Sequence, residues 1–233
     1  RLVTTAHLEG FYYKPRIDKE LLAAHHDGLI GLSACLHGEV AGFLANDDMK
    51  SAVGAAGQYA DILGKENFFL EIQDHGIPEQ RKVNKLLKDV SASTGIPLVA
   101  TNDVHYIEKK HAPAHEVLLC LQTQTVMSDP NRMRLPTAEF YMKRRDEMEP
   151  LFKEFPGSLD LTLDIAEMCT VEMVFGKLHF PTFTAPKGMT QKNHLIKLGK
   201  EGIEQKYGIK NFDHPADDKE REIIQRFNYE LSV

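Results

Sequence analysis

The side chains best suited to metal chemistry follow a short apolar segment near the middle of the chain. Asp103 and His105 stand two positions apart, directly after residues 97–101. On an extended segment such residues project from the same side, so one cation could bridge a carboxylate oxygen and an imidazole nitrogen. This mixture of ligands suits Zn, Mn or Fe in hydrolytic sites. The alternative is that the pair only hydrogen-bonds a loop.

Three further residues are candidates for the same site. Cys35 follows the apolar residues 29–33, and a thiolate there could complete a metal site. The alternative for Cys35 is a small buried filler, the usual role of a free cysteine. Glu71 lies in an apolar run, where an ionised carboxylate is costly unless it is paired or coordinating. We predict that Glu71 and His75 support the metal ligands rather than bind the ion, although His75 could be only a turn residue.

A basic cluster lies further along the chain. Arg132 and Arg134 stand in a turn-rich loop, and three more basic residues follow at 143–145. We predict that Arg132 and Arg134 contact phosphates, against the alternative of a solvated charged face. The sequence contains no GxSxG, GxxxxGK[ST], GxGxxG or HExxH motif, which excludes several common enzyme classes.

The elements that must position these residues alternate between strand and helix in the first half of the chain. Apolar runs predict strands over 29–33, 68–72 and 97–101, and apolar periodicity predicts helices over 19–26, 49–63 and 78–93. Such alternation implies parallel strands covered by helices, as a sheet or barrel of α/β class, with functional groups just beyond the C-terminal strand ends. Cys35, the Asp74–Gly76 segment and the Asp103–His105 segment all follow such ends.

The second half of the chain is predicted to be mostly helical. Helical patterns cover 146–155, 158–168, 192–207 and 219–231, and residues 180–186 form an extended connector with two prolines. We place a boundary near residue 176, which gives domains of 1–176 and 177–233. No internal repeat is evident.

Composition limits the functions further. The 233 residues carry a formal charge of −6, so the chain by itself is predicted to bind nucleic acid weakly. The three widely spaced cysteines fit a reducing cytoplasm without a disulfide framework. No apolar run is long enough to cross a membrane. The chain starts at Arg1 and its first methionine is Met49, so we expect a fragment.

Several long motifs resemble one family of proteins, the alpha subunits of bacterial replicative DNA polymerase III. The resemblance extends over essentially the whole chain. The matching strings are GFYYKPRID (10–18), LSACLHGE (32–39), EIQDHGIPEQ (71–80), PLVATNDVHY (97–106) and DPNRMR (129–134).

The resemblance implies a specific architecture and metal site. The first part of the chain would be the C-terminal half of a polymerase-and-histidinol-phosphatase (PHP) domain, a distorted TIM-like β/α barrel, followed by the start of the polymerase region. Asp103 and His105 would be the last metal-ligand pair of that domain, and Cys35 would stand where relatives carry a cysteine or histidine ligand. The ion would be Zn or Mn, and Mg would serve the polymerase site.

The resemblance also implies an activity and partners. The full-length protein would be a DNA-directed DNA polymerase acting on primer–template DNA and deoxynucleotides, together with a proofreading exonuclease and a sliding clamp. Its PHP domain would carry a possible 3′–5′ exonuclease. The carboxylates of the polymerase palm would follow Val233, so we expect no catalytic residue of polymerisation in this chain. Two alternatives remain: a PHP barrel that is only a structural or interaction module, and a stand-alone PHP-type phosphoesterase.

Overall fold

The computed structural model describes residues 1–178 and 180–233, and these form two compact units, Arg1–Val171 and Glu172–Val233. The N-terminal unit contains both sheets and eight of the α-helices. Its helices are α1 (Leu2–Leu8), α2 (Lys19–Ala24), α3 (Glu39–Ala45), α4 (Met49–Leu63), α5 (Pro78–Thr94), α6 (Ala112–Thr123), α7 (Arg145–Met148) and α8 (Leu161–Met168), with the 3₁₀ turn η1 (Lys109–His111) before α6.

The centre of the N-terminal unit is a three-stranded parallel sheet. Its order is β3 (Gly31–Leu32), β4 (Phe68–Ile72) and β5 (Leu98–Ala100), so the sheet follows the order of the chain. The predicted parallel pairing is therefore confirmed, although β3 and β5 are shorter than the apolar runs suggested. A separate antiparallel hairpin, β1 (Phe11–Tyr12) with β2 (Lys14–Pro15), precedes α2.

Local sequence signals explain the helix ends. The Asp18 carboxylate accepts a hydrogen bond from the Leu21 amide at 2.8 Å, and Asp48 caps α4 in the same way through Ser51. Helix α5 begins with Pro78, where the missing N–H costs nothing, and ends at Gly95 in a left-handed conformation with φ of 74°.

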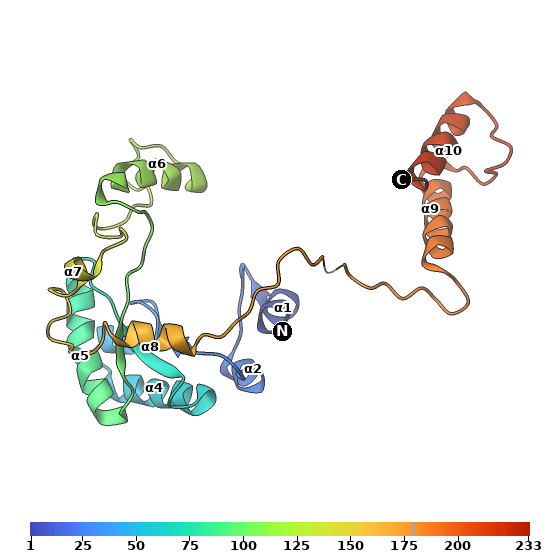
Figure 1. The fold of residues 1–233 in the computed structure, drawn as a ribbon. Coiled ribbons are helices and arrows are strands. Elements are labelled where there is room, and N and C mark those ends of the chain that lie inside the picture. The colour runs from blue at the N-terminus through green and yellow to red at the C-terminus, as the bar shows by residue number, and fades with distance from the viewer. Residues whose placement is uncertain (179) are drawn as a thin grey trace. The chain divides into compact units, whose positions relative to one another are not determined.

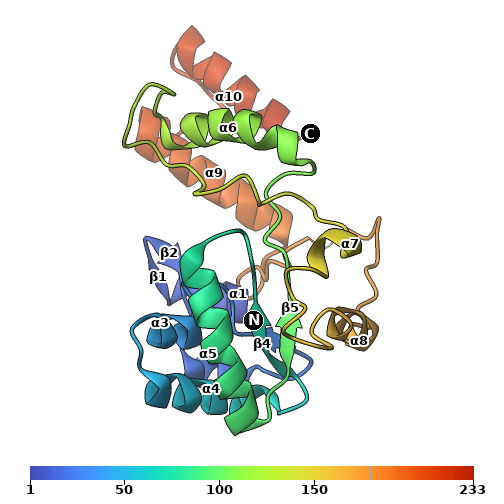
Figure 2. The ribbon, with the colours of Figure 1, turned by 90° about the vertical axis from the view of Figure 1, so that its left-hand side faces the viewer.

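One face of β4 forms the core with three helices. Phe68, Leu70 and Ile72 are buried in a cluster with the apolar faces of α3, α4 and α5. In Figures 1 and 2, α4 and α5 lie side by side over the strands, as their mutual contacts require. The opposite face of β4 carries Phe69 and Glu71, so the sheet has one apolar side and one side with polar groups.

The segment after α6 returns to the sheet and covers its β5 side. Met148, Phe152 and Phe155 join the core cluster, and the Ala100 amide donates to the Ser158 carbonyl at 2.9 Å on the side of β5 away from β4. The helix predicted over 146–155 is wrong, because the structure holds only α7 there, followed by turns. Pro150 explains the difference, since a proline inside a helix removes a hydrogen bond and clashes with the preceding turn.

The fold class is therefore α/β, with a small parallel sheet rather than a closed barrel in the part of the chain that the structure describes. The predicted domain boundary near residue 176 separates a PHP part, 1–176, from the start of the polymerase region, 177–233. This division stays a prediction.

The C-terminal unit is a pair of helices, α9 (Gln191–Tyr207) and α10 (Asp218–Glu230). Both lie within one residue of their predicted bounds. Thr190 and Asp217 cap their N-termini through side-chain oxygens. A Cβ atom at Gly199 would lie 2.5 Å from Cε2 of Phe227, so the glycine allows α9 and α10 to approach closely.

Candidate functional site

Polar side chains gather where the three parallel strands end. Ser33 follows β3, Gln73 and His75 follow β4, and Thr101 follows β5. The Glu71 amide donates to the Ser33 hydroxyl at 2.8 Å, which ties β3 to β4 at this edge. The parallel order of the sheet therefore places these side chains together at the carboxyl ends of the three strands.

Glu71 is held by neighbours on its own and the adjacent strand. Its carboxylate accepts hydrogen bonds from the Thr101 hydroxyl and from Nε2 of Gln73, the latter at 2.9 Å. Gln73 is buried, and its Oε1 has no hydrogen-bond partner. The contacts of Glu71 thus satisfy a half-buried carboxylate by hydrogen bonding.

His75 is fully buried and holds the loop that contains Asp103. Its Nε2 accepts a hydrogen bond from the Asp103 amide at 3.1 Å, and its Nδ1 lies 3.1 Å from Nε2 of Gln80. The ring stacks on Phe140 with centroids 4.5 Å apart. Burial, followed by the charge of Lys143, lowers the pKa of His75, so the imidazole is neutral and can accept from the Asp103 amide.

Asp103 and His105 lie together on the exposed side of this loop. His105 Nδ1 is 3.5 Å from Asp103 Oδ1, and the two side chains are 34% and 45% exposed, respectively. The His105 amide donates to the Phe140 carbonyl at 2.8 Å, which fixes the backbone beneath the pair. The pair therefore presents a carboxylate and an imidazole to solvent.

Cys35 does not join this pair. Among residues 1–178 and 180–233, no three His, Cys, Asp or Glu side chains are placed so that they could hold one metal ion. The chain turns sharply after β3, with φ of 64° at Ala34 and a hydrogen bond from the Gly38 amide to the Cys35 carbonyl at 2.8 Å. Structural zinc sites take four ligands, so the described residues do not by themselves make up a metal site, and the site stays a prediction.

The two loop arginines have different environments. Arg132 is only 12% exposed, and its Nη2 lies 2.8 Å from Oε2 of Glu116 on α6, so its charge is already paired. Its Nε is buried without a partner. Arg134 is exposed and lines a pocket. Of the two predicted phosphate contacts, only Arg134 lines this cavity.

That pocket, of about 480 Å³, adjoins the Asp103–His105 pair. The ring of His115, which lines it, lies 5.6 Å from the ring of His105. Tyr106 also lines the pocket, is 9% exposed, and has a buried hydroxyl with no hydrogen-bond partner. Burial raises the pKa of Tyr106, so its hydroxyl keeps its proton. Neither residue was predicted, although the position of Tyr106 directly after His105 was a signal.

Lys143, the first of the basic residues at 143–145, is buried. Its side chain is 3% exposed, and its ammonium group donates to the Glu139 carbonyl and lies 4.4 Å from the Tyr141 ring centroid. Burial lowers the pKa of Lys143. This lysine is a buried structural cation and is not free to contact a phosphate.

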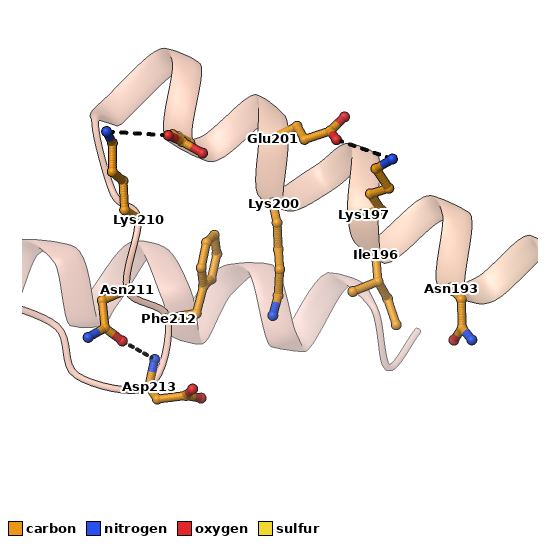
Figure 3. A pocket seen from close by; sticks show the side chains of 10 residues that line it. Asn193, Ile196, Lys197, Lys200, Glu201, Lys210, Asn211, Phe212 and Asp213 are labelled. Carbon is orange, nitrogen blue, oxygen red and sulfur yellow. Dashed lines mark hydrogen bonds and ion pairs between the residues drawn. The ribbon is translucent and has the colours of Figure 1, made fainter. Parts of the chain in front are cut away.

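The C-terminal unit contains a larger groove, of about 740 Å³, between α9 and the loop that leads to α10 (Figure 3). Three lysines and three acids line it, so it carries no net charge. Two of the lysines are matched by carboxylates at 3.7 Å, and the third, Lys200, lies over the Phe212 ring at 4.9 Å. The lining charges are Lys197, Lys200, Lys210, Glu201, Glu204 and Asp213.

Comparison with known proteins shows which family and which relatives the chain resembles. Residues 1–75 match the PHP domain family. The whole chain aligns with the DNA polymerase III subunit alpha of Treponema pallidum at 39% identity, covering 19% of that protein. The resemblance inferred from the motifs is confirmed. The DNA polymerase III alpha subunit of Thermus aquaticus is 43% identical over 89% of this chain and 17% of its own length, and that of Borreliella burgdorferi is 36% identical over the whole chain and 20% of its own length.

The chain thus spans about a fifth of the length of these alpha subunits. In the described part of the chain, no helix combines the length and apolarity needed to cross a membrane.

Proposed function

We propose that this chain is a segment of the catalytic alpha subunit of a bacterial replicative DNA polymerase and carries part of its PHP domain. The observation that supports this most is the alignment of all 233 residues with a DNA polymerase III alpha subunit at 39% identity. The activity of the whole protein would be DNA-directed DNA synthesis on primer–template DNA with deoxynucleotides. It would take place in the cytoplasm with a proofreading exonuclease and a sliding clamp as partners.

Polymerisation would depend on Mg²⁺ ions held elsewhere in the full-length protein, because two-metal nucleotidyl transfer needs a carboxylate site that no residue described above provides. The test is primer extension by the full-length protein that contains this segment. We expect template-dependent incorporation by that protein and none by the 233-residue chain. Failure of the full-length protein to extend a primer would contradict the proposal.

For the fold, we propose that the three-stranded sheet is part of a larger, distorted β/α barrel. The support is the match of residues 1–75 to the PHP domain family together with the parallel order β3, β4, β5. In this arrangement residues 1–176 form the PHP part and residues 177–233 lead into the polymerase region.

We further propose that Asp103 and His105 supply two ligands to a Zn or Mn ion in the PHP domain of the full-length protein. Their support is the 3.5 Å approach of the two side chains and their exposure. Cys35 would join them only in the context of the complete domain, with Glu71 and His75 as supporting residues. Such an ion would supply a Lewis acid for 3′-end hydrolysis, whereas the chain's own residues hold its ligands in place through the His75–Asp103 hydrogen bond.

The test is elemental analysis of the full-length protein with Asp103→Asn and His105→Ala combined. We expect bound Zn or Mn to fall at least tenfold, since loss of supporting partners alone costs 10–100-fold. Cys35→Ala, measured in parallel, would show whether the thiol is a ligand. Polymerisation should be largely retained, and unchanged metal content in the double variant would contradict the assignment.

A second candidate function is a PHP domain that braces the polymerase without turnover. The observation that favours it is that the described residues bring together only two candidate ligands. Bound metal without hydrolysis of single-stranded DNA by the full-length protein would support this role.

A further inference from the structure

The β1–β2 hairpin exposes three consecutive aromatic side chains. Phe11, Tyr12 and Tyr13 are 59%, 64% and 81% exposed, respectively. The rings of Tyr12 and Tyr13 contact each other edge to face, with centroids 4.6 Å apart, so they form one continuous surface. A contiguous exposed apolar surface marks a place where a ligand or partner binds.

The backbone pairing of the hairpin fixes which residues accompany these rings. Tyr12 pairs with Lys14, and the Arg16 amide donates to the Gly10 carbonyl at 3.1 Å. Opposite residues of an antiparallel pair share one face, as do residues two apart on a strand, so Tyr12, Lys14 and Arg16 lie on the same side. The Arg16 guanidinium carbon lies 5.5 Å from the Tyr12 ring centroid, which agrees with this register. A Cβ atom at Gly10 would collide with the Arg16 carbonyl oxygen, so the hairpin needs glycine there.

The tip of the hairpin holds Tyr13 in an unfavourable backbone conformation. Its φ is 58°, in the left-handed region that glycine or asparagine usually occupies and that a bulky side chain rarely adopts. This conformation turns the ring edge-on against Tyr12 at an interplanar angle of 76°. Backbone strain of this kind concentrates at ligand sites, so the placement of the Tyr13 ring indicates that it is used in binding.

The positive charges of the hairpin are not neutralised. Lys14 and Arg16 are exposed, and the ion pairs found among the described residues include neither of them. Residues 10–17 contain no acid, and neither does α1, which contacts both strands. Of the two flanking acids, Glu9 precedes the hairpin, and the Asp18 carboxylate already accepts from the Leu21 amide. The charge of this surface therefore favours an anionic ligand.

A second exposed apolar surface, on α6, shows why the charge matters. Leu118 and Leu121 are both more than half exposed there. Residues 112–123 contain no lysine or arginine, and the acid Glu116 is paired with Arg132. Nothing on α6 identifies the chemistry of a ligand. The hairpin differs because it combines flat aromatic rings with unpaired cations, and single-stranded nucleic acid offers the matching groups, unpaired bases that stack on rings and phosphates that pair with Lys and Arg.

We infer that the β1–β2 hairpin binds single-stranded DNA. Unpaired bases stack on the rings of Tyr12 and Tyr13, and backbone phosphates contact Lys14 and Arg16. A duplex keeps its bases stacked on one another, so it offers no base faces to these rings. Every base has a flat face, so the contact tolerates any sequence. The inference rests on the proposed function only for the choice of DNA, and it can fail while polymerisation and the metal site remain.

The experiment is fluorescence anisotropy of the 233-residue chain with labelled oligo(dT) of about 16 nucleotides, a typical length for a single-strand site. Three probes of equal length are compared with it: an abasic strand, which keeps the phosphates but lacks the bases, a dT·dA duplex, and oligo(rU). We expect oligo(dT) to bind more tightly than each of them. Equal affinity for the abasic strand would overturn stacking, equal affinity for the duplex would overturn single-strand binding, and tighter binding of oligo(rU) would overturn the assignment to DNA.

A double variant tests the rings. Tyr12→Leu combined with Tyr13→Leu keeps apolar side chains but removes both aromatic faces. We expect affinity for oligo(dT) to fall about tenfold or more, since loss of one base–aromatic stack has an effect of this size. Thermal unfolding should change little because both side chains are exposed. The matched control is Tyr229→Leu in α10, where the ring is 60% exposed and lies 5.7 Å from the Arg226 guanidinium carbon. An equal loss in the control would overturn the inference.

A single variant tests the cations without changing the rings. Lys14→Gln should weaken binding of oligo(dT) and of the abasic strand alike, and it should lower the slope of log affinity against log salt concentration by about 1. An unchanged slope would show that Lys14 does not contact a phosphate and would overturn its assignment.

The same surface could serve a membrane, because aromatic and basic residues also bind anionic lipid. Vesicles of phosphatidylglycerol test this by co-sedimentation with the 233-residue chain and the double variant. We expect no loss of vesicle binding in the double variant. Vesicle binding that depends on Tyr12 and Tyr13, together with no binding of oligo(dT), would overturn the inference in favour of a lipid surface.

Discussion

The two units of the chain differ most in what they bury. In the described residues, Ile209 and Ile224 are the buried apolar side chains of the C-terminal unit, whereas the N-terminal unit buries a continuous cluster around β4, α4 and α5. The C-terminal helices depend instead on side-chain caps and on charged pairs along their surfaces. Burial of apolar area stabilises far more than exposed ion pairs do, so the N-terminal unit should be the more stable one.

The largest effect should come from the core of the N-terminal unit. Leu70→Ala removes a fully buried side chain from β4, and we expect the free energy of unfolding to fall by about 2–5 kcal/mol. Urea denaturation followed by circular dichroism measures this. The matched control is Leu195→Ala in α9, where the side chain is 59% exposed, and its cost should stay below about 0.5 kcal/mol. Equal losses in the two variants would remove the proposed difference between the units.

A smaller effect should follow from a buried polar contact of the same unit. His75→Phe keeps an aromatic ring against Phe140 but leaves the Asp103 amide and Nε2 of Gln80 without the imidazole as a partner. We expect a loss of about 1–3 kcal/mol and faster hydrogen exchange at the Asp103 amide. His7→Phe, at an exposed position in α1, serves as the control. Unchanged exchange at Asp103 would show that the imidazole does not hold this loop.

The smallest effect should occur in the C-terminal unit. Asp217→Ala removes the carboxylate that accepts from the Glu220 amide at 2.8 Å, and an N-cap of this kind contributes about 1 kcal/mol. We expect amides in the first turn of α10 to lose protection, while those of β4 stay unchanged. Asp213→Ala, in the loop before the helix, should have no such effect. A loss of protection in β4 would show that the two units unfold together.

Local sequence signals were sufficient to predict the bounds of several helices and strands. The apolar run 68–72 and the periodicity of 49–63 predicted β4 and α4 at their observed bounds, because Gly64 and the polar residues around each element end the pattern sharply. The apolar spacing over 146–155 indicates a helix, but Pro150 ends helical structure there. The sequence gives no periodic signal for α6, because its apolar residues 117–121 form a continuous run.

The candidate site could be predicted only where its members are close in sequence. Asp103 and His105 come together because an extended loop places them there, whereas the position of Cys35 depends on the turn at Ala34, which no pattern indicated. The sequence likewise does not show the difference between Arg132 and Arg134. Glu116, which lies 16 positions before Arg132 in α6, pairs with Arg132. Nothing in the sequence indicates that the Tyr106 hydroxyl is buried without a hydrogen-bond partner.

The hydrogen bond from the Ala100 amide to the Ser158 carbonyl affects whether another strand can pair with β5. An edge strand offers a row of unpaired amides on which another chain can assemble, and proteins often protect such edges with a covering loop. Here one outward amide of β5 is already occupied by the turn that follows α7. Strand addition by another chain is thus obstructed on the β5 side of the sheet.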